Sequence, residues 1–118
     1  LRFRIENSIS QVAQILESED FNNLNGVGAS ISTTYLSNQF GIAQKLSGLY
    51  DDDRNKIGRF APGSGTEVFP LGALPSGEKC LTIILAWQHT EKLLSRLREN
   101  RFAGRVLIPL PTPVVLEI

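Results

Sequence analysis

The chain has 118 residues, with 12 Lys plus Arg and 12 Asp plus Glu, so its formal net charge at neutral pH is zero. This length is typical of one domain with its own core, and the balanced charge disfavours a nucleic-acid partner, which normally requires a basic surface. A single cysteine, Cys80, excludes an internal disulfide, and we expect it to pack as a small buried hydrophobe.

No apolar run approaches the roughly 20 residues of a membrane-spanning helix, and the N-terminal residues lack the apolar region of a signal peptide. We therefore predict a cytoplasmic domain with no membrane partner. The chain contains no Met, even at its first position. We expect residues 1–118 to form one domain taken from a longer polypeptide.

The first predicted element is a helix over Ile9–Glu17. Ser8–Gln11 has the spacing of a capping box, and apolar residues recur at helical intervals after it. The polar segment that follows breaks this period. A short strand over Leu24–Val27 is predicted next.

A glycine turn, Asn25–Ser30, follows that strand and leads into a second predicted helix, Ile31–Phe40. Ser30 is a suitable N-cap, and Gly41 is a suitable stop. A turn between a strand and a helix directs backbone N–H groups toward the space above it. This segment therefore predicts a site for an anion or for the edge of a nucleotide.

The middle of the chain predicts two strands separated by a long polar loop. Lys45–Tyr50 is compatible with a strand, Arg54–Gly65 reads as the loop, and Glu67–Leu71 is a second strand. Pro70 lacks the N–H group that a sheet ladder needs on both sides. We expect the second strand to lie at the edge of the sheet.

The segment Leu81–Trp87 is almost continuously apolar, which is typical of a central parallel strand covered on both faces. We predict that it lies next to the strand that contains Gly26. A surface helix over Thr90–Arg101 follows, because leucines recur on one stripe and charges on the other. Gly104 is its predicted stop.

Two further strands are predicted over Arg105–Pro111 and Val114–Leu116. Strands and helices thus alternate along most of the chain, and this alternation favours a mostly parallel sheet flanked by helices. The predicted fold class is α/β, a Rossmann-like three-layer α/β/α domain.

Gly26 and Gly28 form part of the glycine pattern of dinucleotide-binding folds, and Asp51 follows at the separation of the acidic residue that binds ribose in such folds. The third glycine of the pattern is replaced by Ile31. Each of these residues also has a structural interpretation. Glycines permit positive φ in turns, and aspartates commonly cap them.

No catalytic residue and no metal site are predicted. His89 is the only histidine and has no nucleophile or second metal ligand at motif spacing. We expect it to cap the following helix or to lie at the surface. Trp87 and Gln88 are predicted at the carboxyl end of the central strand, where ligands bind in open α/β sheets, although Trp87 could equally pack between layers.

The motifs together resemble the C-terminal domain of S-adenosylmethionine-dependent sugar C-methyltransferases. The resemblance covers almost the whole chain after Asn23. It is carried by Gly26–Ser30, Asn38, Gly41–Ile42, Tyr50–Asp53, Lys56–Phe60, Pro62–Gly63, Leu85–Gln88 and Ile108–Pro111.

The resemblance implies that this chain is the C-terminal piece of a longer protein. In that family a separate middle domain holds S-adenosylmethionine, a zinc-binding segment precedes it, and the C-terminal domain helps to hold a nucleotide sugar. We therefore expect this domain to bind no cofactor itself and to be non-catalytic. Its expected partners are the nucleotide sugar or a similar small molecule and the neighbouring methyl-donor domain, and a homo-dimer is an open alternative.

Two positions depart from the pattern of that family. Ser32 and Thr33 stand where it usually has a basic residue and a glycine, so a positive charge is lost where an anion could be held. Gln88 replaces the usual Asn after Trp87, which keeps the amide on a longer side chain.

We predict a ligand crevice at the carboxyl ends of the strands that contain Gly26 and precede Trp87. Lys56 is included because it could pair with a phosphate group. The predicted substrate-binding residues are Gly26, Gly28, Ala29, Ser30, Asp51, Lys56, Trp87 and Gln88.

Two other functions remain open at this point. The glycine pattern with Asp51 also suits an autonomous nucleotide-binding domain of a dehydrogenase or a sugar-modifying transferase. The lost charge at Ser32 suits a degenerate Rossmann domain that serves docking or dimerisation.

Overall fold

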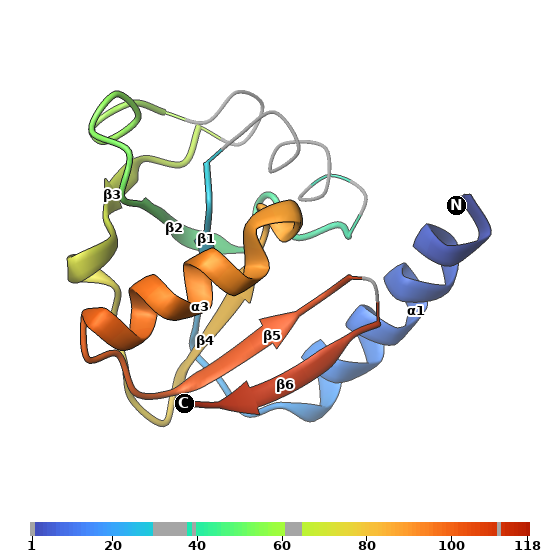
Figure 1. Cartoon of the computed structure of the whole chain (residues 1–118). Coiled ribbons are helices and arrows are strands. Elements are labelled where there is room, and N and C mark those ends of the chain that lie inside the picture. Colours follow the sequence, from blue (N-terminus) through green and yellow to red (C-terminus); the bar gives the residue numbers. More distant parts are fainter. Residues whose placement is uncertain (1, 30–37, 39, 61–64, 111) are drawn as a thin grey trace.

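The computed structural model describes all residues except 1, 30–37, 39, 61–64 and 111, and of residues 2–7 it describes the backbone alone (Figure 1). The described helices of more than one turn are α1 (Arg2–Ser18) and α3 (Thr90–Glu99). The strands are β1 (Asn23–Val27), β2 (Leu46–Asp51), β3 (Val68–Pro70), β4 (Cys80–Ile84), β5 (Arg105–Ile108) and β6 (Val114–Glu117).

The strands form one six-stranded sheet in the order β3-β2-β1-β4-β5-β6. Neighbours are parallel except for β6, which runs antiparallel to β5. This confirms the predicted α/β class with a mostly parallel sheet. The order reverses between β1 and β4, and ligands of open α/β sheets bind above such a reversal. The predicted helix Ile31–Phe40 falls largely outside the described residues.

The predicted position of the central strand is confirmed. In the parallel register of β1 and β4, Gly26 is opposite Ile83. The end of the strand was predicted wrongly, because β4 stops at Ile84 and Trp87 begins a 3-10 turn, Trp87–His89. Leu85 and Ala86 remain buried after leaving the strand, so the apolar run does not mark where the strand ends.

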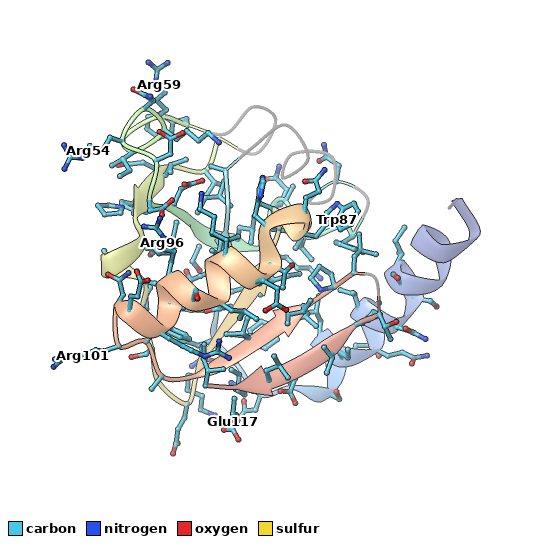
Figure 2. The ribbon with its side chains drawn as sticks, viewed as in Figure 1. Arg54, Arg59, Trp87, Arg96, Arg101 and Glu117 are labelled. Carbon is cyan, nitrogen blue, oxygen red and sulfur yellow. The ribbon has the colours of Figure 1, made fainter. Side chains whose placement is uncertain are left out.

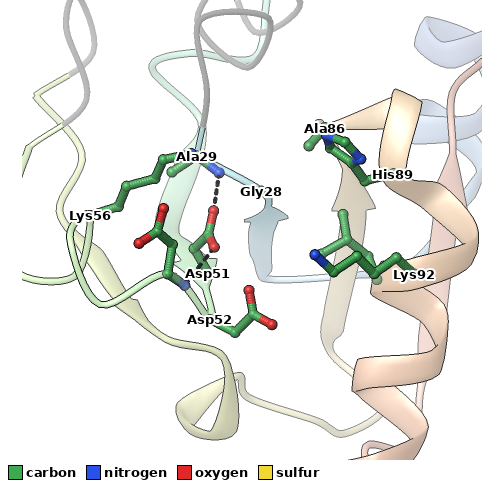
Figure 3. A pocket seen from close by; sticks show the side chains of 10 residues that line it. Gly28, Ala29, Asp51, Asp52, Lys56, Ala86, His89 and Lys92 are labelled. Atoms are coloured by element: carbon green, nitrogen blue, oxygen red, sulfur yellow. Dashed lines mark hydrogen bonds between the residues drawn. The ribbon is translucent and has the colours of Figure 1, made fainter.

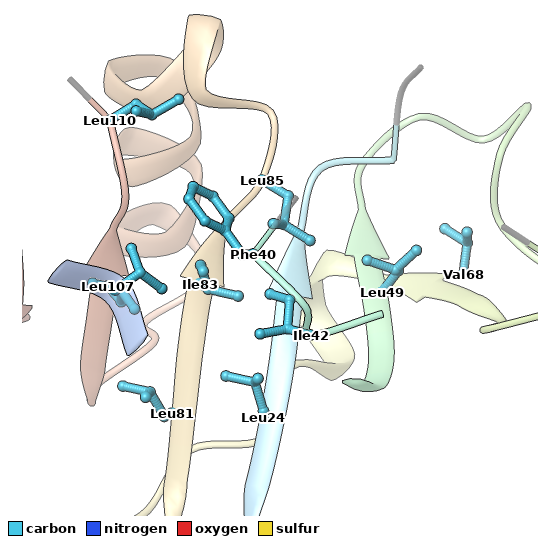
Figure 4. Close-up of a cluster of buried hydrophobic side chains, with 11 residues drawn as sticks. Leu24, Phe40, Ile42, Leu49, Val68, Leu81, Ile83, Leu85, Leu107 and Leu110 are labelled. Carbon is cyan, nitrogen blue, oxygen red and sulfur yellow. The ribbon is translucent and has the colours of Figure 1, made fainter. Parts of the chain in front are cut away.

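The two faces of the sheet carry separate hydrophobic clusters. On one face, Val12 of α1 packs with inward side chains that include Leu81 and Ile83 (Figure 4). On the other, the leucines of α3 pack with Ile84 and Val106. Alternate residues of β4 thus face α1 and α3, as expected for a strand covered on both sides.

Gly104 does not end helix α3 as predicted, because the helix closes earlier, at Arg101. Arg101 has φ 58°, and two backbone hydrogen bonds close the helix, from Phe102 N–H to Leu97 O at 3.0 Å and from Arg101 N–H to Arg98 O at 3.0 Å. This is the Schellman pattern, with arginine in the position that glycine usually occupies. Gly104 instead exchanges two backbone hydrogen bonds with Ile118, beyond β6.

Other boundaries differ less. Helix α1 begins at Arg2, ahead of the predicted start at Ile9, while β3 lies at the sheet edge as Pro70 predicted. Cys80 is a free thiol and only half-buried. In the described part of the chain, no helix is both long and apolar enough to cross a membrane.

Candidate functional site

A cavity of about 250 Å³ lies at the carboxyl ends of β1, β2 and β4, above the point where the strand order reverses (Figure 3). Its walls come from the turn after β1, the loop after β2, and the start of α3. The lining residues are Gly28, Ala29, Asp51, Asp52, Asp53, Lys56, Ala86, His89, Lys92 and Leu93.

Gly28 brings the turn after β1 against the chain that follows β4. Its φ is 99°, a conformation that side chains rarely adopt, and an added Cβ would lie 2.4 Å from Ala86 Cβ and 2.9 Å from Ala86 N. Its backbone N–H donates to Tyr50 O at 2.8 Å. Glycine is therefore required here by the backbone conformation and by the close approach of Ala86.

Asp51 holds the same turn from the end of β2. The residue is only 8% exposed. Its Oδ2 accepts a hydrogen bond from Ala29 N–H at 2.7 Å, and its Oδ1 accepts one from Asp53 N–H at 2.9 Å. A carboxylate is suited to this position because it can accept at both oxygens. The N–H groups of Gly28 and Ala29 thus bind within the protein. The rest of the predicted anion site, from Ser30 onward, falls outside the described residues.

The two neighbouring aspartates also have partners. Asp52 Oδ2 lies 3.4 Å from Arg96 Nη1, which joins the loop after β2 to α3. Asp53 Oδ1 accepts a hydrogen bond from Asn55 N–H at 2.9 Å and closes a local turn. Each carboxylate of this wall therefore has a structural role.

The lysines of the cavity differ from its aspartates. Neither Lys56 nor Lys92 has an ion pair or a side-chain hydrogen bond with any residue that the structure describes. Lys56 lies in the loop after β2, and Lys92 lies in the first turn of α3, on the facing wall (Figure 3). Arg54 and Arg59 of the same loop as Lys56 instead point away from the molecule (Figure 2).

His89 precedes α3 and faces the cavity from the side of Lys92 (Figure 3). Its side chain makes no capping hydrogen bond to the helix, so of its two predicted roles the surface position is the one observed. Thr90 Oγ donates instead to Trp87 O at 2.7 Å.

Four of the predicted substrate-binding residues line the cavity: Gly28, Ala29, Asp51 and Lys56. Three others lie elsewhere. Gly26 is in the interior of β1, where an added Cβ would meet Leu85 Cδ1 at 2.6 Å. Trp87 packs against the cluster on the α1 face, and Gln88 is exposed outside the cavity. Ser30 falls outside the described residues.

The sequence analysis did not include His89, Lys92 and Leu93 among the site residues. A usable signal was present, because these three positions are spaced as one face of a helix that starts just after the central strand. That face points toward the carboxyl ends of the strands. Lys92 belongs to the charges that the sequence pattern assigns to the exposed face of the predicted helix Thr90–Arg101.

Among the described residues, no group of three His, Cys, Asp or Glu side chains is placed to hold a metal ion. Fold and cavity together define an α/β domain with a polar cavity at its order reversal. The chain matches the C-methyltransferase C-terminal domain family over residues 3–111, and it belongs to that family. This confirms the resemblance seen in the sequence. No curated protein matches the chain.

Proposed function

We propose that this domain binds the substrate of a C-methyltransferase, a nucleotide sugar, in the cavity at the carboxyl ends of β1, β2 and β4. The observation that carries the proposal is the place of the cavity at the order reversal, in a chain of this family. A volume of about 250 Å³ suits the polar part of such a ligand better than the whole of it.

We further propose that the domain is not catalytic by itself. This proposal rests on the family that the chain resembles, in which the methyl donor sits in a separate middle domain; the described lining of the cavity also includes no serine, threonine or cysteine nucleophile. S-adenosylmethionine would then bind to a neighbouring methyl-donor domain of the parent protein. A cytoplasmic location and a homo-dimer remain predictions from the sequence.

Calorimetric titration of the chain with a panel of nucleotide sugars, NAD and S-adenosylmethionine tests this function. We expect at least one nucleotide sugar to bind, S-adenosylmethionine to bind no better than weakly, and no methyl transfer to occur. Methyl transfer by the chain alone would contradict the non-catalytic role. Binding of NAD in place of a nucleotide sugar would favour a dehydrogenase-type domain, and self-association without any ligand would favour a docking domain.

A further inference from the structure

We propose that the cavity holds its ligand through a phosphate-type anion bound between Lys56 and Lys92, while Asp51 positions the glycine turn and does not contact the ligand. This inference rests on the proposed function for the identity of the whole ligand. The recognised chemistry is that of phosphoryl oxygens, which a nucleotide sugar or free pyrophosphate can supply.

The acidic wall of the cavity consists of Asp51, Asp52 and Asp53. Three carboxylates line the cavity, and each is engaged: Asp51 by two backbone N–H groups, Asp52 by Arg96, and Asp53 by the N–H of Asn55. Backbone and guanidinium donors offset part of the negative charge of these groups. The negative field of this wall inside the cavity is therefore weaker than three aspartates suggest.

The two lysines of the cavity differ from these carboxylates. Lys56 is half-buried and Lys92 is exposed, and neither ammonium group has a partner among the described residues. Each offers three hydrogen-bond donors and no acceptor. Two ammonium groups that line one cavity from opposite walls are placed to donate to one anion held between them.

The start of α3 strengthens the same side of the cavity. Lys92 lies in the first turn of this ten-residue helix, whose N-terminal end carries a partial positive charge. His89, just before the helix, adds a further polar group to this wall. The electrostatics of this wall thus favour an anion near Lys92.

The proposed position of the anion differs from that in dinucleotide-binding folds, in which the phosphate lies on the glycine turn after the first strand. Here the N–H group of Ala29 donates a hydrogen bond to the carboxylate of Asp51, and the N–H group of Gly28 donates one to Tyr50 O. A phosphate at that turn would meet a carboxylate. The anion is therefore expected between Lys56 and Lys92 rather than on the N–H groups of that turn.

The test uses Lys56→Gln, Lys92→Gln and the double variant, with Lys45→Gln as the matched control. Lys45 is exposed and precedes β2, at the opposite end of the sheet from the cavity. The probes are UDP-glucose, dTDP-glucose, GDP-mannose and inorganic pyrophosphate, with uridine as a probe that lacks phosphate. Circular dichroism and urea unfolding check that each variant keeps its fold and stability.

We expect each single variant to bind its best phosphate probe about 5- to 20-fold more weakly than the parent, as for the loss of one partly exposed charge-assisted contact. The double variant should lose more, and Lys45→Gln should bind like the parent. Added salt should weaken the parent more than the double variant, because screening acts on the lost charges. Uridine should show no lysine dependence.

The outcomes separate this inference from the proposed function. If a nucleotide sugar binds the two lysine variants as tightly as the parent, the inference is overturned and the proposed function stands. If pyrophosphate binds with the expected lysine dependence and no nucleotide sugar binds, the inference stands and the proposed function is overturned. If neither kind of phosphate probe binds the parent, both are overturned.

Discussion

The cavity at the carboxyl end of the sheet contains two lysines without partners among the described residues, whereas two basic residues at the amino end are bonded to neighbouring segments. At the amino end, Arg105 and Lys79 both have bound partners, and their bonds join the segments that enter β1, β4 and β5. At the carboxyl end, Lys56 and Lys92 have none among the described residues. The difference indicates which charges stabilise the fold and which are available for a ligand.

The amino end is held together mainly through Arg105. Its Nη2 donates to Asp20 O at 2.6 Å and to Glu78 O at 2.5 Å, and its Nη1 lies 3.3 Å from Glu19 Oε1. Its side chain is only 18% exposed. At the carboxyl end the corresponding ties are the close backbone approach of Gly28 to Ala86 and the two N–H groups bound by the Asp51 carboxylate.

The largest effect is expected from Gly28→Ala, which breaks the main tie at the carboxyl end. The new Cβ would sit 2.4 Å from Ala86 Cβ at a φ of 99°. Backbone strain and overpacking should together lower the free energy of unfolding by about 3 kcal/mol. Urea unfolding at constant pH measures this change.

Gly58→Ala is the matched control, because Gly58 has φ 86° and no atom within 4 Å of an added Cβ. It should cost only the strain of the backbone conformation, about 1 kcal/mol. Equal losses in the two variants would show that the approach of Gly28 to Ala86 adds nothing. Because Gly28→Ala is expected to destabilise the fold, weaker ligand binding by this variant would not show that Gly28 contacts the ligand.

The second-largest effect concerns how much Arg105, at the amino end, and the two cavity lysines contribute to stability. Arg105→Gln should lower the free energy of unfolding by about 1–3 kcal/mol, because it removes charge-assisted hydrogen bonds to two backbone carbonyl groups and a carboxylate. Lys56→Gln and Lys92→Gln should each change it by less than about 0.5 kcal/mol, as for surface residues without partners. Stability losses at the two lysines as large as at Arg105 would remove the distinction between the two ends.

Much of the fold was predictable because hydrophobic patterns report burial directly. The continuous apolar run at Leu81–Trp87 predicted the central strand next to β1, and Pro70 predicted the edge position of β3. Boundaries were harder to predict. Leu85 and Ala86 are buried for reasons of tertiary packing after the strand ends, and Arg101 takes a conformation that glycine usually supplies.

The position of the candidate site could be predicted from the sequence better than the residues that line it and their contacts. Parallel topology alone brings the carboxyl ends of β1, β2 and β4 together, so Gly28 and Asp51 could be named from their positions after strands. Whether a polar group is already bonded depends on partners far away in sequence. No local sequence signal indicates the bond from Ala29 N–H to Asp51, or that Lys92 has no partner among the described residues.

The smallest expected effect concerns pH at the amino end. The hydrogen bond and the positive charge of Lys79 lower the pKa of Asp20 below its ordinary value of 3.8. A carboxyl group with a lowered pKa in the folded state binds fewer protons there than in the unfolded state. Its contribution to stability is therefore complete above about pH 4 and is lost as the pH falls through the folded-state pKa.

Asp20→Asn should remove this contribution and so flatten the fall in unfolding free energy between pH 5 and pH 2, as measured by urea unfolding at low salt. The change should be small, because both side chains are exposed, and added salt should reduce it further. Lys79→Gln should flatten the same interval, and the two changes together should do no more than either alone, since they remove one interaction. Additive effects would mean that Asp20 and Lys79 act through separate partners.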